Sequence, residues 1–171
     1  MSSPAMFRAY LSAPHFYTPP SPLNYIDVPW DRVAIDETGW FDTATGLWKP
    51  LAAGKLLCFW QVWDQAGAYK SQGNGVVAKL IGADSTGADK SLGGVSEDTA
   101  GIGFIGAYAY TSNALGHAVV RVASGDSWKV SNYCQASTDP ATPLDSGQTL
   151  GQVAIDPNPA HTFWEAMFFP D

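Results

Sequence analysis

An almost unbroken apolar run in the first half of the chain limits the possible folds more than any other feature. From Leu56 to Trp63 every residue except Gln61 is apolar, so both alternating faces of a strand here would be apolar. Such a strand needs cover on both sides, which predicts a central position in a sheet. The last run, Thr162 to Phe169, is almost wholly apolar on both faces too and has the same requirement.

Short extended runs and turn signals surround this central strand. Residues 32–35 alternate between apolar and other side chains, and residues 36–39 interrupt them. Residues 42–46 are polar or small and end in Gly46, which suits a turn that needs a left-handed residue. We also predict strands over residues 7–11, 76–81 and 101–110, and a hairpin over 118–130 that turns at 124–126. One face of this hairpin carries Val120, Val122, Trp128 and Val130.

Two segments are predicted to be loops. Residues 14–24 contain four prolines, which rules out a helix or a central strand there. Residues 135–161 also combine prolines with polar residues. No window has a sustained helical period, and seven or more short strands between turns predict an all-β sandwich of two sheets.

The length of 171 residues is typical of one domain. We therefore interpret residues 1–171 as a single unit, with a flexible tail over 1–5 and a proline-rich loop over 14–24. The net charge of −7 and a pI near 4.7 argue against a nucleic-acid partner, because no cluster of lysine and arginine is present. No apolar run is long enough to insert into a membrane, and no leader segment is visible.

The order of these motifs resembles the globular head of the first complement component and its tumour necrosis factor-like relatives. The family has a Val-Pro-Phe-like start, a Phe-Asp-x-x-Thr-Gly-x-Phe turn, a Pro-x-x-Gly-x-Tyr-x-Phe strand, an Ala-Gly-Asp turn and a Tyr-Pro-Asp-like end. Trp48 and Leu56 replace the usual Phe and Tyr, and both keep a large apolar side chain. The matching segments are Val28-Pro29-Trp30, residues 41–48, residues 50–59, Ser124-Gly125-Asp126, Thr162-Phe163 and Phe169-Pro170-Asp171.

The resemblance implies a tumour necrosis factor-like, two-sheet antiparallel jelly roll that assembles as a homotrimer. In that family the last strand lies in the inner sheet, whose outward face packs on two other copies around a threefold axis. We expect a trimer here because the last strand is apolar on both faces. The residues assigned to this trimer interface are Phe163, Trp164, Phe168 and Tyr108.

The sequence offers no catalytic constellation, so the protein is not expected to be an enzyme. Residues 101–106 match GxGxxG, but no strand-then-helix context surrounds them, and glycines that make room on a strand explain them better. The three histidines have no metal-ligand spacing, and no GxSxG motif occurs. Cys58 and Cys134 are interpreted as two buried thiols in preference to a disulfide.

Calcium is the one cofactor that the sequence leaves open. Acidic side chains gather in one polar segment, and calcium takes oxygen ligands from such loops. The resembled family sometimes carries calcium near its threefold apex. No tight Asp-x-Asp-x-Asp pattern occurs, so solvated loop charges are the preferred interpretation. The candidate ligands are Asp84, Asp89, Glu97 and Asp98.

Loops are the expected ligand-binding elements, because strands in a trimeric jelly roll are committed to core and interface. The long segments 64–75, 82–100 and 135–161 mix polar residues with aromatic residues at their edges, as sugar binding requires. We expect a phage fibre or spike head that recognises host surface glycan, in a virion or outside cells, docked on a stalk or particle protein. The alternative is an extracellular complement-like domain that binds other proteins. The candidate ligand residues are Trp63, Asp64, Tyr69 and Tyr133.

Glu165 is unusual because it lies inside the apolar last strand, where the resembled family has glycine. A buried carboxylate without a partner is strongly destabilising. Arg8 is the predicted partner, because the first and last strands are neighbours in this fold.

Overall fold

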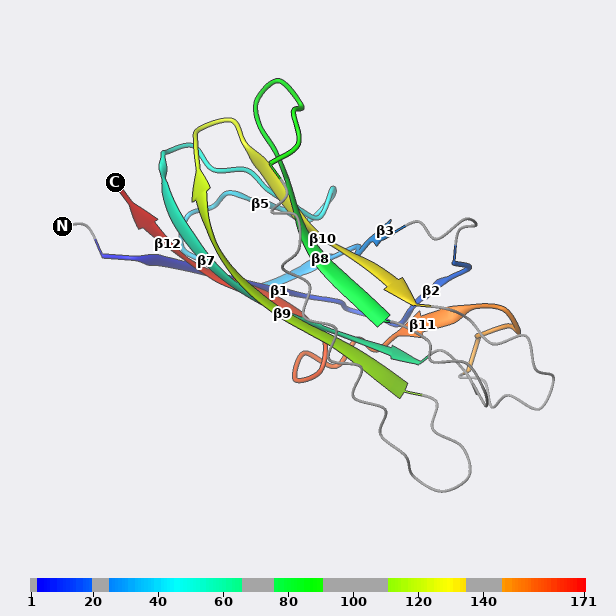
Figure 1. Cartoon of the computed structure of the whole chain (residues 1–171). Coiled ribbons are helices and arrows are strands. Elements are labelled where there is room, and N and C mark those ends of the chain that lie inside the picture. Colours follow the sequence, from blue (N-terminus) through cyan, green and yellow to red (C-terminus); the bar gives the residue numbers. More distant parts are fainter. Residues whose placement is uncertain (1–2, 20–24, 66–75, 91–110, 135–145) are drawn as a thin grey trace.

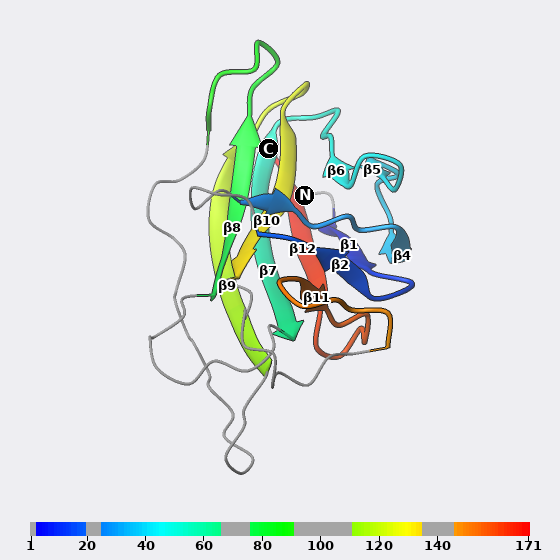
Figure 2. The same cartoon turned by 90° about the vertical axis from the view of Figure 1, so that its right-hand side faces the viewer.

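A computed structural model describes residues 3–19, 25–65, 76–90, 111–134 and 146–171. Over these residues the chain forms two antiparallel sheets packed face to face (Figures 1 and 2) and no helix, so the described residues hold no helix able to cross a membrane. This confirms the predicted all-β, two-sheet class. The seven-stranded sheet contains β1 (Ala5–Tyr10), β2 (His15–Tyr17), β4 (Arg32–Asp36), β7 (Gly54–Gln65), β9 (Thr111–Val122), β11 (Val153–Ile155) and β12 (Phe163–Pro170). The five-stranded sheet contains β3 (Ile26–Asp27), β5 (Phe41–Asp42), β6 (Leu47–Trp48), β8 (Val76–Ala83) and β10 (Ser127–Cys134).

The predicted central strand is confirmed as β7, which pairs with β12 on one side and β9 on the other. Its even-numbered residues, from Leu56 to Asp64, are buried between the sheets. Its odd-numbered residues, from Lys55 to Trp63, point to the outward face of the seven-stranded sheet. Among the described residues, nothing covers the second apolar face of this strand.

Tryptophans fill much of the core between the sheets. Five of the seven tryptophans of the chain have exposed fractions of 1% or less. Phe7 of β1 joins this cluster, with its ring centroid 5.7 Å from that of Trp48 and 4.9 Å from that of Trp164. Aromatic contacts of this kind add to the stabilisation from apolar burial. The five tryptophans are Trp30, Trp48, Trp60, Trp128 and Trp164.

The turn at residues 42–46 takes the left-handed conformation predicted from Gly46, whose φ is +67°. The amide of Gly46 donates to the carbonyl of Asp42 at 2.8 Å, and the Asp42 carboxylate accepts from the Thr45 hydroxyl at 2.7 Å. Hydrogen bonds from Thr45 and from the Ala44 amide lower the pKa of Asp42. The turn that carries the family resemblance is therefore closed by its own side chains.

The predicted hairpin over residues 118–130 is wrong. Val120, Val122, Trp128 and Val130 are all buried, as predicted, but β9 pairs with β7 while β10 pairs with β8, β3 and β6. The two strands therefore belong to different sheets, and the buried side chains of both point into the core between them. A pattern of period two identifies the buried face of a strand, but it does not identify the hydrogen-bonding neighbour.

Both predicted loops contain a short strand. β2 lies between prolines in the 14–24 segment, and β11 lies within 135–161. Among the described strands, β2 pairs only with β11 and is therefore an edge strand. Prolines can flank such a strand because they are excluded only from its paired residues. Ala5, which was predicted to lie in the flexible tail, already pairs with Phe168. The predicted strand at 101–110 and the GxGxxG motif lie outside the described residues.

Candidate functional site

The outward face of the seven-stranded sheet is strongly apolar. One row crosses four adjacent strands, because Met6 pairs with Met167, Met167 with Leu57, and Leu57 with Val119. Val119 is 62% exposed in the single chain. Three more large apolar side chains on this face are also exposed. They are Phe59, Leu115 and Phe169.

A charged pair interrupts this apolar face. Arg8 pairs with Glu165 in the β1–β12 register, and Arg8 Nη1 lies 3.7 Å from Glu165 Oε2. The predicted partnership is therefore confirmed, although both side chains remain about one-third exposed in the single chain. Arg8 Nη2 also donates to the Pro159 carbonyl at 2.8 Å, and the guanidinium lies 5.0 Å from the Phe163 ring centroid. Arg8 thus joins the sheet face to the segment between β11 and β12.

The residues assigned to the trimer interface divide between two faces. Phe163 points outward, on the same face as Glu165. Trp164 and Phe168 point into the core of their own chain, where they are 0% and 4% exposed. Adjacent residues of a strand alternate between faces, so these two side chains are committed to the core. Tyr108 lies outside the described residues.

The three candidate ligand residues that the structure describes do not lie together. Trp63 is half-buried on the outward face of β7 and stacks on His161, with ring centroids 4.7 Å apart. The imidazole of His161 is held by Asp156, with Nδ1 and Oδ2 2.8 Å apart. Tyr133 lies on β10, in the other sheet, and Tyr69 lies outside the described residues.

Asp64 is completely buried between the sheets and is therefore not a ligand contact in this structure. Both of its carboxylate oxygens accept from Asn132 Nδ2, at 2.9 and 3.0 Å. The same nitrogen lies 3.3 Å from the Tyr17 hydroxyl. Burial raises the pKa of Asp64 to about 7, against the opposing effect of the Asn132 hydrogen bond. This cluster connects β7 and β2 of one sheet to β10 of the other.

The outward face of the five-stranded sheet is polar and aromatic. Tyr133 packs edge-on against Tyr25, with ring centroids 6.2 Å apart, and Lys79 Nζ lies 4.2 Å from the Tyr25 ring centroid. Asp27 on this face binds Lys129 Nζ at 2.7 Å and the Ser131 hydroxyl at 2.8 Å. Tyr25 and Lys79 are not among the site residues predicted from the sequence. The alternation of β8 predicts Lys79 on the same face as Ile81, but nothing in the sequence pairs Lys79 with Tyr25.

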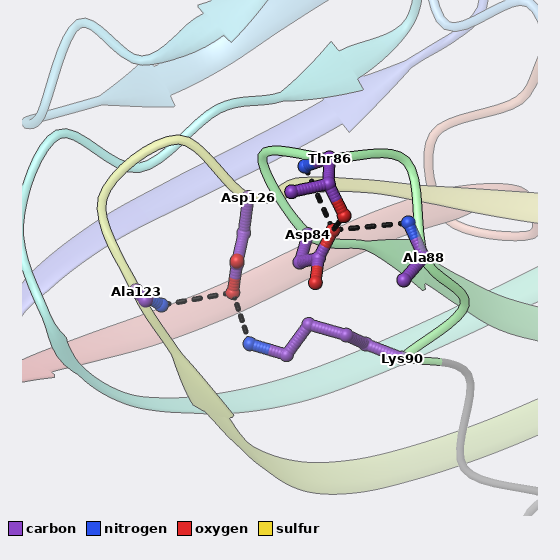
Figure 3. A network of polar contacts seen from close by, with 6 residues as sticks. All are labelled: Asp84, Thr86, Ala88, Lys90, Ala123 and Asp126. Carbon is purple, nitrogen blue, oxygen red and sulfur yellow. Dashed lines mark hydrogen bonds and ion pairs between the residues drawn. The ribbon is translucent and has the colours of Figure 1, made fainter.

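The acidic segment after β8 uses its charges within the protein (Figure 3). Asp84 Oδ1 accepts from the amide of Thr86, the hydroxyl of Thr86 and the amide of Ala88, at 2.7 to 2.9 Å. These bonds, the Thr86 hydroxyl first, lower the pKa of Asp84. Lys90 Nζ lies 2.5 Å from Asp126 Oδ2, which also accepts from the Ala123 amide at 2.8 Å. The Asp126 ion pair therefore docks the segment on the turn between β9 and β10.

The described part of the chain does not bring the proposed calcium ligands together. Asp89 is exposed, and Glu97 and Asp98 lie outside the described residues. Within the described residues, no group of three or more histidine, cysteine or acidic side chains is arranged to hold a metal ion. Cys58 is a free, buried thiol, and burial raises its pKa. The Cys134 side chain lies outside the description.

No protein-family model matches the chain, and no curated protein sequence matches it. Solved structures do match across nearly the whole chain. Crystal structures of murine APRIL include one with a TM-score of 0.61 and 10% identity, covering 98% of this chain and 100% of that one. The globular domain of zebrafish complement 1qA matches with a TM-score of 0.52 and 13% identity, over 99% and 100% of the two chains. The Eiger tumour necrosis factor of S. frugiperda gives 0.57 and 13%, over 98% and 92%.

These similarities place the chain in a class of folds. With two antiparallel sheets and neighbours of this kind, it has the jelly roll of tumour necrosis factor and complement globular-head domains. Identities of this size show the fold and nothing further.

Proposed function

We propose that this chain is a non-enzymatic, homotrimeric recognition module whose copies pack through the outward face of the seven-stranded sheet. The apolar row from Met6 to Val119 carries the proposal. An apolar row of this kind, with Met6 and Val119 exposed and Leu57 and Met167 half-buried, is typical of an interface, because water contact with it is unfavourable. The resembled family uses the corresponding face for its threefold contact, so the occupant we assign is two further copies of the chain.

The trimer is tested by mass in solution. Light scattering of the purified chain at micromolar concentration is expected to give about 55 kDa, three times 18.2 kDa. A stable species of 18.2 kDa under these conditions would contradict the proposal.

We further propose that the trimer recognises surface glycan, as the attachment head of a phage fibre or spike outside the host cell, docked on a stalk or particle protein. The support is chemical. Aromatic and polar side chains lie together on the outward face of the five-stranded sheet, where Tyr133 packs against Tyr25 beside Lys79, and sugars bind through ring faces and hydroxyl groups. Weak single sites repeated three times on one axis gain about 10²–10⁴ in avidity.

Glycan recognition is tested by adsorption of the purified trimer to a glycan array and to cells before and after enzymatic removal of surface glycan. Adsorption is expected to need both the glycan and the trimer, so an obligate monomer is the matched control. Binding that is unchanged after the glycan is removed would reject this function.

The similarity to the complement 1qA globular domain supports one alternative, an extracellular domain that binds other proteins. The glycan array separates the two proposals. A trimer that binds no saccharide but is retained by purified surface proteins stripped of glycan would support the alternative.

A further inference from the structure

If the seven-stranded sheet is covered by other copies, the outward face of the five-stranded sheet is, among the described residues, the broad sheet surface left for a ligand. Three half-buried side chains lie together there, and we call them the tyrosine–lysine patch: Tyr25, Lys79 and Tyr133. They come from three different parts of the chain, the segment before β3, the strand β8 and the strand β10. The patch and the covered face therefore lie on opposite sides of the sandwich.

The register of the sheet explains how the patch forms. Ser131 of β10 pairs with Lys79 on one side and with Asp27 on the other. Ser131 is small, so the long side chain of Lys79 can extend across it toward Tyr25, where Nζ lies 4.2 Å from the ring centroid. Tyr133, two residues further along β10, packs against the same ring. The ring of Tyr25 thus restrains the Lys79 ammonium group. Binding a ligand there costs less side-chain conformational entropy, because the lysine is already partly ordered.

The charge of Lys79 is not balanced by a carboxylate among the described residues. The ion pairs formed there use Lys49, Lys90 and Lys129 but not Lys79. The nearest acidic residue in the sheet register, Asp27, is occupied by Lys129 and Ser131. A restrained cation without a carboxylate partner among the described residues is suited to a single anionic group from outside.

We propose that the tyrosine–lysine patch binds a carboxylated saccharide, such as a uronic-acid unit of a surface polysaccharide. The Lys79 ammonium donates to the sugar carboxylate, and the apolar face of the sugar ring packs on the exposed tyrosine surface. This proposal rests on the glycan recognition proposed above and specifies its ligand class and location. It gives each trimer three equivalent sites on its outer surface.

The test uses the full chain as a trimer, titrated with oligogalacturonate and with the same oligomer after its carboxylates have been reduced to alcohols. Wild-type protein is expected to bind the carboxylated oligomer, to bind the reduced oligomer at least about tenfold more weakly, and to lose affinity as salt rises. K79M and Y25A are each expected to weaken binding of the carboxylated oligomer by about tenfold or more. The matched control is K129M, which removes a lysine from the same face whose charge is already paired with Asp27, and is expected to leave binding within about twofold.

Several outcomes would overturn the proposal. The proposal fails if K79M binds oligogalacturonate as tightly as wild type. It also fails if K79M and K129M lose the same amount of affinity. Dextran sulfate that competes as well as oligogalacturonate would also contradict it, because it would indicate unspecific charge attraction. A trimer that binds neutral glycans on the array but not oligogalacturonate rejects this inference and leaves glycan recognition standing. A trimer that binds no saccharide at all rejects both.

Discussion

The two sheets present opposite surfaces although their inner faces are alike. Both bury tryptophan on the inside, Trp60 and Trp164 in the seven-stranded sheet and Trp48 and Trp128 in the five-stranded sheet. On the outside, the first sheet presents methionine, leucine, valine and phenylalanine, together with the Arg8–Glu165 pair and the exposed residues Lys55, His117 and Arg121. The second presents lysine, aspartate, serine and tyrosine.

This difference is the reason for proposing different partners for the two surfaces. An apolar sheet face is stabilised by contact with another apolar face, whereas a polar and aromatic face is compatible with solvent and with a polar ligand. The core is common to both, so substitutions on the outside can test the two assignments without unfolding the chain.

The largest effect is expected from a charge in the middle of the apolar row. Val119→Asp places a carboxylate at a position that is 62% exposed in the single chain, so folding is expected to change little. Three such charges buried in a trimer are expected to weaken association by at least about a thousandfold, because each ion loses its hydration. The measurement is mass by light scattering. The control is Ile81→Asp, on the outward face of the other sheet, which is expected to leave the mass at three chains. Loss of the trimer in both variants would contradict the proposed difference between the two faces.

The next effect concerns the inner faces, which we expect to respond alike. A Cβ at Gly116 would overlap the Trp60 indole, and one at Gly82 would lie 2.5 Å from a Trp128 ring carbon. Gly116→Ala and Gly82→Ala are each expected to lower the free energy of unfolding by about 3 kcal/mol, because a fully buried indole has no space to move into. Urea unfolding measures this cost. The Gly116→Ala cost should be much smaller in a Trp60→Leu background, and an equal cost in both backgrounds would show that the indole is not its cause.

Much of this architecture was predictable from the sequence because the burial pattern of a strand is local. The central strand, the left-handed turn at Gly46, the partnership of Arg8 with Glu165 and the two-sheet class followed from alternation, turn residues and the family resemblance. Which strands pair is not local, and here the prediction was wrong for β9 and β10. Alternation is the same whether two strands lie side by side or face each other across a core.

The candidate site shows the same limit. Trp63 and Asp64 are adjacent in sequence and were assigned together, but adjacent residues of a strand point to opposite faces, so one is outward and the other buried. Tyr25 and Lys79 come from distant segments, and only the register of β8 and β10 brings Lys79 to Tyr25. A site built from several strands therefore depends on pairing, which composition and spacing do not encode.

A smaller effect, dependent on pH, is expected at the buried cluster that connects the two sheets. The pKa of Asp64 is raised from 3.8 to about 7, so the folded chain holds this proton more tightly than the unfolded chain. The stability contributed by the bound proton is complete below about pH 4 and is lost as pH rises through about 7. Asp64→Asn removes this titration and is expected to be more stable than wild type by a few kcal/mol above about pH 7, with the difference shrinking toward about pH 4.

The measurement is the difference in unfolding free energy between Asp64→Asn and wild type from pH 4 to 8. Taking the difference cancels the groups common to both proteins. These include His15, which stacks on Tyr17 and whose pKa burial lowers, and Asp84, whose pKa is lowered by its turn. A difference that is constant with pH would mean that Asp64 does not carry a raised pKa.

The smallest effect is expected from the charged pair on the apolar face. Arg8 and Glu165 are about one-third exposed in the single chain, so breaking the pair there is expected to cost no more than about 1 kcal/mol. In a trimer the same pair would lie within an apolar interface, where Arg8→Met leaves the Glu165 carboxylate without a cation. We expect Arg8→Met to raise the dissociation constant of the trimer by about tenfold, and the double variant with Glu165→Met to restore it, because a buried pair replaced by apolar side chains loses little. If the Arg8→Met trimer has the same dissociation constant as wild type, Glu165 stays in contact with water after assembly. The threefold contact would then lie away from β12.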